Sequence, residues 1–369
     1  MQREQMPELL DHVRLHGRTV QNETGDTLYF NWTCAGFTVR FQGSVLRARL
    51  TARGAPPVGE AQGAPEYPWI GVVGADGETL LHRIECREEC AWYTLWQGET
   101  GGEHTLRVVK LTENARGKTG LMALETDGRL LPAPPRKKRM LEFVGDSITC
   151  GYGNEAQGRD EPFRPQEENG WAAYAAAAAR ALDAEFRCVS VSGISVSKGA
   201  TGRSAFPGMP AMEELYEAAD HCYDTLCGAA PRPWDFDRDR PDAVVVNLGT
   251  NDVNPVRFAP DLAAAQTEEA FFRARYTAFL HTLRRCNGPG AWLVCTLGPL
   301  DYYLYDTLQQ AVAAYQRESG DQKILCFKFI GVNLLTEGFG AVGHPSAKTH
   351  ARMARELAAR LQPLLAEKV

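Results

Sequence analysis

The sequence predicts an α/β protein in which a flavodoxin-like, five-stranded parallel sheet follows an all-β sandwich domain. The first observation is length, because 369 residues at about 100–200 residues per domain indicates two domains. The second is a change near residue 135, from short alternating runs to near-continuous apolar runs separated by helical stretches. We therefore expect a sandwich over 1–134, a linker over 135–140 and an α/β domain over 141–369.

The N-terminal part contains short runs in which apolar and charged residues alternate, a pattern typical of half-buried strands. Turn-forming residues such as Gly77 and Gly128 separate these runs. Many short strands with turns at close spacing predict a β-sandwich or barrel. The predicted strands are residues 37–41, 45–50, 69–73, 79–84 and 104–109.

After residue 140 the pattern becomes strand, loop and helix, repeated. The strands have almost no polar face, which predicts a parallel sheet covered on both sides. In such sheets the functional residues follow the carboxyl ends of the strands. The predicted strands are 141–144, 188–191, 243–248, 293–297 and 324–329, and the predicted helices are 171–182, 212–219, 268–285, 307–318 and 347–361.

The composition is that of a folded, mildly acidic protein. Hydrophobic residues make up 44% and charged residues 23%, which argues against global disorder. A net charge of −6 argues against a general nucleic-acid or anionic-membrane binder. The sequence contains no run of 18 apolar residues, so no transmembrane helix is expected.

Ten cysteines are present, and several lie inside apolar runs where buried thiols belong. The spacings of Cys86 with Cys90 and of Cys222 with Cys227 are poor for a zinc site. The N-terminus also lacks the apolar core of a secretory signal. We therefore expect reduced thiols, no bound metal and a cytoplasmic location.

Four short segments at the ends of predicted strands carry side chains suited to nucleophilic catalysis. Ser147 lies in a tight strand-to-helix turn, a suitable place for a nucleophile. Gly193 follows the second strand, where its N–H can approach a ligand closely. Asn251 follows the third strand and can donate to an oxyanion, and His344 precedes the last helix and can deprotonate the serine. Each signal is weak alone, but their order at the strand ends of one domain argues against coincidence.

These four segments resemble the conserved blocks of the SGNH (GDSL) hydrolase superfamily. The longer run over residues 142–154 is similar to carbohydrate esterase family 2, and so is the upstream stretch over 105–113. Members of that family join a β jelly roll to an SGNH domain. The resemblance covers essentially the whole chain. It implies an acetylesterase that removes acetyl groups from plant-type xylo- or manno-oligosaccharides, as an acetyl xylan esterase does.

The resemblance also implies a role for each residue. Ser147 would be the nucleophile, and His344 the general base and then the general acid. The N–H groups of Ser147 and Gly193 and the side-chain amide of Asn251 would form the oxyanion hole. The reaction would proceed through an acetyl-enzyme and requires no metal or other cofactor.

Two positions depart from the family pattern. SGNH enzymes commonly place an aspartate three residues before the histidine, where this chain has Ala341. A Ser–His dyad is therefore predicted, and a backbone carbonyl or Glu337 is a candidate to orient His344. Asp146 and Asp252 are expected to brace their own loops. The second departure is Gly343, because family members often carry a bulky aromatic residue there, and its absence could widen the site or change the sugar preference.

Several further side chains are candidates for substrate binding. Tyr302 and Tyr303 follow the fourth predicted strand, and aromatic rings there can stack on sugars or simply pack. Trp171 and Tyr174 share one face of a predicted helix, which favours core packing, and His350 is expected to be exposed. The complete candidate set is Tyr152, Trp234, Tyr302, Tyr303 and Arg203.

Two other classes of function stay open at this point. One is an SGNH hydrolase acting on another ester, such as a lipase, thioesterase or peptidoglycan O-acetylesterase. An apolar lid would favour the lipase, and a signal for export would favour the peptidoglycan O-acetylesterase. The sequence indicates neither feature. The other class is a glycan-binding protein without turnover, which the intact four segments disfavour. The expected partner is an acetylated oligosaccharide, with no nucleic acid and no membrane, and a β-sandwich also offers surfaces for a homo-oligomer.

Overall fold

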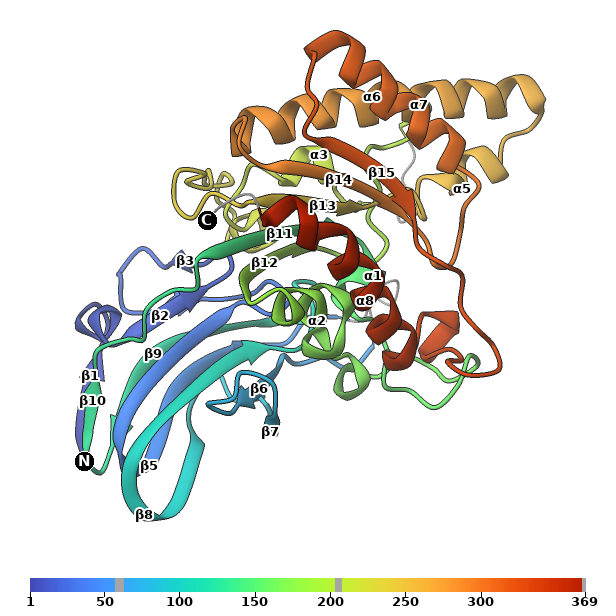
Figure 1. Ribbon diagram of the computed structural model, residues 1–369. Helices are drawn as coiled ribbons and strands as arrows, with labels where there is room; N and C mark the ends of the chain where they lie inside the picture. Colours follow the sequence, from blue (N-terminus) through green and yellow to red (C-terminus); the bar gives the residue numbers. More distant parts are fainter. Residues whose placement is uncertain (57–62, 203–207, 367–369) are drawn as a thin grey trace. The chain divides into compact units, whose positions relative to one another are not determined.

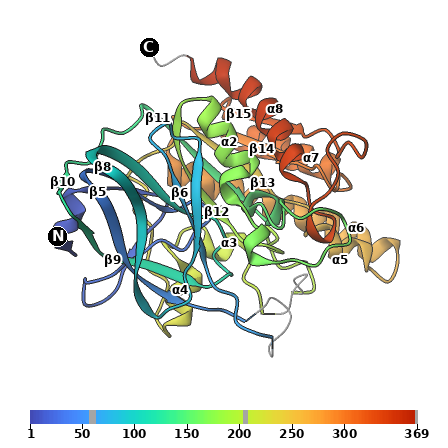
Figure 2. The same cartoon turned by 90° about the horizontal axis from the view of Figure 1, so that it is seen from below.

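The computed structural model describes residues 1–56, 63–202 and 208–366, and these form two compact units (Figures 1 and 2). The first unit comprises Met1–Lys137, Arg164–Trp171 and Ala219–Arg232. The second comprises Lys138–Phe163, Ala172–Ala218 and Pro233–Val369. Two segments that follow Lys137 in the chain therefore belong to the first unit, a grouping that the sequence did not predict.

The first unit is an antiparallel β-domain, as predicted. Within its described residues, a ten-stranded sheet has the order β3-β4-β9-β5-β8-β6-β7, with β1 on β9 and both β2 and β10 on β5. The strands are β1 Gln2–Gln5, β2 Val13–His16, β3 Val20–Gln21, β4 Leu28–Tyr29, β5 Gly36–Arg53, β6 Trp69–Val73, β7 Leu80–Glu85, β8 Cys90–Lys110, β9 Lys118–Thr126 and β10 Arg129–Leu131. A short 3₁₀ helix covers Glu8–Asp11, and helix α4 covers His221–Leu226.

Strand β5 is longer than the sequence suggests. Residues 37–41 and 45–50 are predicted as two strands, but the structure has one strand from Gly36 to Arg53. The pairing of β5 with β8 shifts register between Gly43 and Val45, and because the chain accommodates this irregularity the strand continues beyond Gly43. Gly43 interrupts the alternating pattern without ending the strand, so the sequence alone suggests a turn there.

Buried hydrogen bonds tie both later segments to the β-domain. Asp220 accepts from the side-chain amides of Asn31, at 2.7 Å, and Asn114, at 3.0 Å. Glu168 accepts from the backbone N–H of Glu113 at 3.1 Å. Because Glu168 and Asp220 are buried, these bonds satisfy polar groups that would otherwise be unpaired, and they fix both segments to the first unit.

The second unit has a parallel sheet of order β12-β11-β13-β14-β15, the predicted flavodoxin-like order. Each strand lies within about four residues of its predicted range at either end. The bounds are β11 Arg139–Gly145, β12 Ala184–Ser190, β13 Ala243–Asn247, β14 Trp292–Leu297 and β15 Ile324–Lys328. Every residue of β12 and β13 is buried. This explains the apolar run of β13, whereas β12 also buries Glu185 and Arg187, which lie before the predicted strand over 188–191.

The helices of this unit are α1 Ser147–Cys150, α2 Tyr174–Ala181, α3 Met212–Leu215, α5 Val253–Arg257, α6 Leu262–Asn287, α7 Tyr305–Ser319 and α8 Ala347–Leu365. A short 3₁₀ turn covers Ala341–Gly343 in this unit. Of two others, Pro165–Glu167 lies in the first unit, and Gly170–Ala172 begins in the first unit and ends in the second. Helix α2 packs with α8, and α6 packs with α7 (Figure 1). The direction of chain crossover reverses after β12, so the two pairs cover opposite faces of the sheet.

A buried ion pair spans the first two strands of the sheet. Glu142 on β11 faces Arg187 on β12 in register, and both side chains are buried. The Tyr216 hydroxyl also donates to Glu142, and Asn287 donates to the Tyr216 oxygen at 2.7 Å. Removing one charge of such a pair leaves the other buried and uncompensated.

We expect Glu142→Gln to destabilise the protein by about 3–5 kcal/mol, because the Arg187 guanidinium would lose its counter-charge. Urea unfolding followed by circular dichroism measures the change. The matched control is Glu217→Gln, since Glu217 pairs with Arg285 at an exposed site. That variant should lose no more than about 1 kcal/mol. Equal losses in the two variants would contradict the argument.

Candidate active site

Ser147 is the first residue of helix α1, directly after strand β11. The Asp146 carboxylate caps this helix by accepting the Ile148 N–H at 2.9 Å, and Gly151 ends it in the left-handed region at φ 80°. These two residues confine α1 to a single turn, with the serine at its N-terminus. Ser147 as a whole residue remains 8% exposed. The sequence therefore builds the strand-to-helix turn that a nucleophile requires.

His344 lies within hydrogen-bond distance of this serine. Its Nε2 is 2.9 Å from Ser147 Oγ, and its Nδ1 is 3.2 Å from the carbonyl oxygen of Ala341. A carbonyl oxygen can only accept, so the proton of the neutral ring resides on Nδ1. The Nε2 lone pair is then free to accept the Ser147 hydroxyl proton. This is the tautomer that a general base needs.

Of the two candidates for orienting His344, the structure places the backbone carbonyl against the ring. Glu337 bonds instead to Arg352, with Nε donating at 2.6 Å and Nη2 at 3.0 Å. The Ser346 hydroxyl donates to the Glu337 carbonyl oxygen at 2.8 Å. Glu337 therefore anchors the loop before α8 and makes no recorded bond to the imidazole.

Backbone hydrogen bonds hold the histidine loop against the segment that follows α1. Ala341 N–H donates to the Gly153 carbonyl at 2.9 Å, and Gly343 N–H donates to the Arg159 carbonyl at 3.0 Å. Between them, Val342 adopts φ 50°, a left-handed conformation that is unfavourable for a β-branched residue. Such strain persists only where surrounding contacts determine the backbone, and it is typical of functional loops.

Three N–H donors lie at the ends of neighbouring strands. Across the described chain, no acceptor is recorded for the backbone N–H of Ser147 or Gly193, and Gly193 has φ 81°. The Asn251 side-chain amide donates to the Ile194 carbonyl at 2.9 Å. Its second contact, with Asp146, is long at 3.5 Å. Two open backbone N–H groups, and an Asn251 amide whose contact with Asp146 is long, can stabilise an oxyanion.

The two aspartates of these segments are buried. Burial raises the pKa of Asp146 to about 7, although the hydrogen bond from the Ile148 N–H acts to lower that pKa. Burial also raises the pKa of Asp252 to about 8. Asp252 accepts the Val196 N–H at 2.9 Å. Asp146 braces its own loop as expected, but Asp252 holds the neighbouring loop that contains Gly193, which corrects the expectation for that residue.

Among the predicted substrate-binding residues, Tyr152 lies beside His344, with ring centroids 4.3 Å apart. Its ring also stacks on Phe163, at 4.2 Å between centroids. The Tyr302 hydroxyl donates to the Phe329 carbonyl at 2.8 Å, which braces the end of β15. Tyr303 is 54% exposed. The sequence did not identify Phe163, because it lies in a loop that shows no periodicity.

The remaining candidates differ in accessibility. Trp234 is 8% exposed and packs against the guanidinium groups of Arg187 and Arg238, which leaves little of its ring for a sugar. Arg203 lies outside the described residues. Trp171 and Tyr174 are buried, as predicted, but they do not share a helix face, because α2 begins at Tyr174 and Trp171 lies in the preceding 3₁₀ turn.

His350 is fully buried, so the expectation that it is exposed is wrong. Its Nδ1 accepts the Tyr174 N–H at 3.2 Å, and its ring stacks on the Tyr174 ring. Burial, with a smaller contribution from His344, lowers the pKa of His350 to about 3. His350 lies on the face of α8 that packs against α2, whereas we predicted from the sequence that it lies on the exposed face of this helix.

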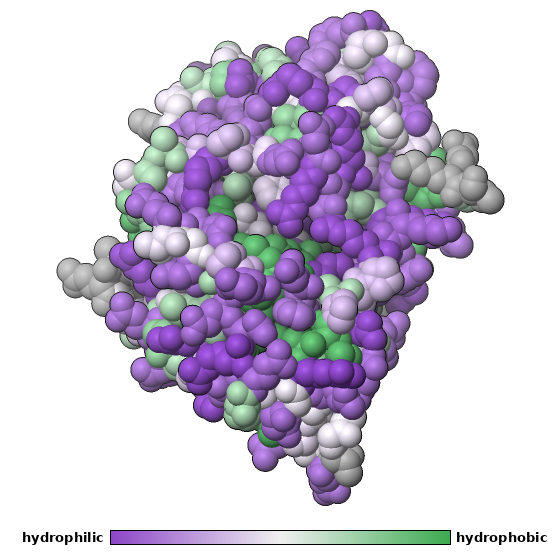
Figure 3. Space-filling view, turned by 90° about the vertical axis from the view of Figure 1, so that its left-hand side faces the viewer, coloured by the Kyte–Doolittle hydropathy of each residue, from purple (hydrophilic) through white to green (hydrophobic). Residues whose placement is uncertain are grey.

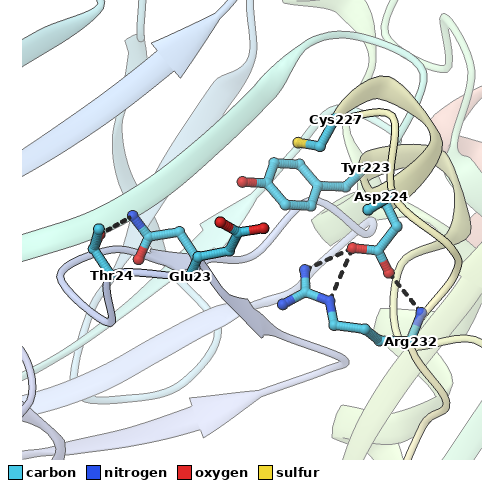
Figure 4. Close-up of a pocket in the computed structure, with 8 residues that line it drawn as sticks. Glu23, Thr24, Tyr223, Asp224, Cys227 and Arg232 are labelled. Carbon is cyan, nitrogen blue, oxygen red and sulfur yellow. Dashed lines mark hydrogen bonds and ion pairs between the residues drawn. The ribbon is translucent and has the colours of Figure 1, made fainter.

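A separate pocket of about 420 Å³ lies in the first unit. Its wall includes Glu23, Tyr223 and Arg232 (Figure 4). Arg232 is already engaged, because it bonds Asp224 through Nε and Nη2 and donates to the Gln21 carbonyl at 2.6 Å. The pocket contains none of the predicted catalytic residues.

Hydrophilic residues cover most of the face of the molecule shown in Figure 3.

Comparison with known families decides the assignment. Residues 143–360 match the GDSL-like lipase/acylhydrolase family, and residues 15–134 match the carbohydrate esterase 2 N-terminal family. This chain belongs to carbohydrate esterase family 2 of the SGNH hydrolases. Both the predicted resemblance and the predicted pairing of a jelly roll with an SGNH domain are thereby confirmed.

Individual relatives agree with this assignment. The chain is 34% identical over 276 residues to the cellulase/esterase CelE of Acetivibrio thermocellus, and the match covers 73% of this chain and 31% of that protein. It is 28% identical over 356 residues to an acetylxylan esterase/glucomannan deacetylase of Cellvibrio japonicus, covering 96% of this chain and 89% of that one. This chain thus spans about a third of the first relative and most of the second.

Solved structures share the fold across both units. A family two carbohydrate esterase from Clostridium thermocellum, in complex with cellohexaose, superposes with a TM-score of 0.80 at 27% identity. The match covers 96% of this chain and 99% of that one. No helix in the described ranges is both long and apolar enough to cross a membrane.

Proposed function

We propose that this protein is a serine carbohydrate esterase that removes O-acetyl groups from plant-type oligosaccharides of the xylan or mannan kind. The observation that carries the proposal is the 2.9 Å contact between Ser147 Oγ and His344 Nε2, beside two open backbone N–H groups. The acetylxylan esterase and glucomannan deacetylase activity named for a relative supports the substrate class.

In the first half of the reaction, Ser147 Oγ attacks the acetyl carbonyl carbon while its proton moves to His344 Nε2. The carbonyl electrons move to the oxygen, and the N–H groups of Ser147 and Gly193 and the amide of Asn251 stabilise this oxyanion. The intermediate collapses, the bond to the sugar oxygen breaks, and His344 gives its proton to that oxygen. The deacetylated sugar leaves, and the acetyl group remains on Ser147.

In the second half, water attacks the acetyl carbonyl and gives a proton to His344. The second tetrahedral intermediate uses the same oxyanion donors. Its collapse breaks the bond to Ser147 Oγ, which takes the proton back from His344 and releases acetic acid. All the bonds and protons are accounted for by Ser147, His344, substrate and water.

The dyad is the second part of the proposal. The carbonyl oxygen of Ala341 stands where a carboxylate commonly orients the histidine, and its dipole fixes the ring and its tautomer. A carbonyl stabilises the imidazolium less than a carboxylate does, because it carries only a partial charge. The oxyanion donors therefore supply a larger share of the catalysis in this site.

Acetate release from acetylated manno- and xylo-oligosaccharides tests the substrate class. Release by the wild-type protein supports the proposal, and the position of cleavage can be identified from the products. Absence of release from both series would contradict it. Binding of the sugars without turnover would then favour the glycan-binding alternative.

We expect Asn251→Ala to lower kcat by about 100–1,000-fold, because one oxyanion donor is lost. KM should change little, since the amide acts on charge that develops only in the transition state. Steady-state kinetics on an acetylated oligosaccharide measures both constants. The control is Asn254→Ala, in the helix directly after Asn251, which should retain near wild-type activity. A large rise in KM with kcat unchanged would assign Asn251 to substrate binding instead.

The cytoplasmic location predicted from the sequence belongs to the proposal as well. All ten cysteines are thiols, and six of them are buried. Thiols in this number suit a reducing compartment. An esterase there would act on oligosaccharides that have already been imported, and cell fractionation tests this placement.

A further inference from the structure

The segment Gly153–Phe163, here called the Arg159 loop, runs directly beside the residues that carry His344. Val342 N–H donates to the Glu161 carbonyl at 3.1 Å, and Gly343 N–H donates to the Arg159 carbonyl at 3.0 Å. These two bonds place the backbone at Arg159 against the residue that immediately precedes the histidine. The side chain of Arg159 is therefore held close to the active site.

Arg159 occupies the space beside Gly343, which has no side chain. A Cβ built on Gly343 would lie 3.7 Å from both Cγ and Nε of Arg159, an ordinary packing distance. The guanidinium carbon lies 5.4 Å from the centre of the Phe339 ring. The stem of Arg159 thus packs over the glycine, and its charged end rests on an aromatic face beside the histidine loop.

Apart from its contact with the Phe339 ring, the guanidinium of Arg159 is left without a charged partner among the described residues. Arg159 is exposed, and within the described part of the chain it makes no ion pair, although Glu155, Asp160 and Glu161 lie in the same loop. By contrast, Arg352 near the same loop is fully paired with Glu337 and Glu356. A guanidinium that is positioned by packing and has no carboxylate partner in the protein can bind a carboxylate of a ligand.

The position of Arg159 decides which part of the substrate it faces. His344 gives its proton to the departing sugar oxygen, so groups packed beside the histidine loop line the sugar side. The oxyanion donors Gly193 and Asn251 come from other strand ends and face the acyl oxygen. Arg159 is consequently placed to contact the sugar and not the acetyl group.

We propose that Arg159 recognises a carboxylate carried by the sugar part of the substrate, so that the preferred substrates are acetylated oligosaccharides bearing a uronic acid. This inference rests on the proposed function and makes it more specific. Arg159 is a specificity residue that binds the substrate without taking part in the bond changes. A carboxylate held by a guanidinium gains charge-assisted hydrogen bonds, which are stronger than those of a neutral hydroxyl.

The test compares two acetylated xylo-oligosaccharides of equal length, one neutral and one bearing a uronic acid. Arg159→Gln should lower kcat/KM for the acidic substrate by about tenfold, and leave the neutral one within about twofold. Arg159→Lys should retain part of the preference, since it keeps the charge but loses the planar fork. The matched control is Arg317→Gln, an exposed arginine at the end of α7, which should change neither substrate.

Two further measurements complete the test. Added salt should weaken the wild-type preference for the acidic substrate, because screening reduces an exposed ionic contact. Hydrolysis of 4-nitrophenyl acetate, which has no sugar, should be the same in wild type and Arg159→Gln. A loss there would place Arg159 on the acyl side and overturn the inference.

The outcomes separate this inference from the function on which it rests. If wild type hydrolyses both oligosaccharides equally and Arg159→Gln changes neither, the acidic preference is wrong and the esterase function stands. If wild type hydrolyses neither substrate, the proposed function fails and the inference fails with it. A preference that Arg159→Gln abolishes supports both.

Discussion

Replacing Ser147 with alanine is expected to lower the rate of acetate release by about 10⁴- to 10⁶-fold. The alanine keeps the helix turn and its backbone N–H, so the oxyanion donors stay in place. What is lost is the atom that forms the acetyl-enzyme, and with it the division of the reaction into two easier steps. The measurement is single-turnover acetate release from an acetylated oligosaccharide, with wild type and variant at equal concentration.

Two controls make the Ser147→Ala result interpretable. Ser319→Ala removes an exposed hydroxyl at the end of α7 and should leave the rate unchanged. Thermal unfolding of Ser147→Ala should stay close to that of wild type, because the change removes one oxygen at a partly accessible position. A folded Ser147→Ala protein that releases acetate at more than about a hundredth of the wild-type rate would exclude the serine mechanism.

Much of the α/β unit could be predicted, because its sequence repeats one physical pattern. Five apolar runs alternate with helices, and strands buried on both faces leave few other arrangements. The topology then places Ser147 and Asn251 at the same edge of the sheet. His344 could be assigned because it lies in the loop that returns from that edge to the last helix.

The features that sequence reasoning missed depend on contacts between distant residues. Arg159 and Phe163 lie in an irregular loop, and contacts with distant residues bring that loop to the site: the backbone bonds to residues 341–343 and the contacts of the two side chains with Phe339 and Tyr152. The carbonyl of Ala341 was one of two candidates, since nothing in the sequence says which acceptor a histidine ring faces. Likewise, Glu168 and Asp220 join the first unit through buried hydrogen bonds that span long stretches of chain.

The second large effect is expected for His344, and it can be combined with a test of the dyad. His344→Ala should lower kcat by about 10⁴- to 10⁶-fold, because Ser147 would lose the base that accepts its proton. The variant keeps the backbone of the loop, whose hydrogen bonds to Gly153 and Arg159 do not involve the ring. Rates measured across a range of pH report the loss, since hydroxide can partly replace the base at high pH.

Glu337→Gln distinguishes a dyad from a triad. In a triad, replacing the orienting carboxylate with an amide lowers kcat by about 10⁴-fold. Here the Glu337 carboxylate bonds to Arg352 while the Ala341 carbonyl faces His344, so we expect a fall of less than about tenfold. The amide oxygen can still accept from Arg352, which protects the fold. A thermally stable Glu337→Gln protein with a thousandfold lower kcat would show that the carboxylate, and not the carbonyl, supports the histidine.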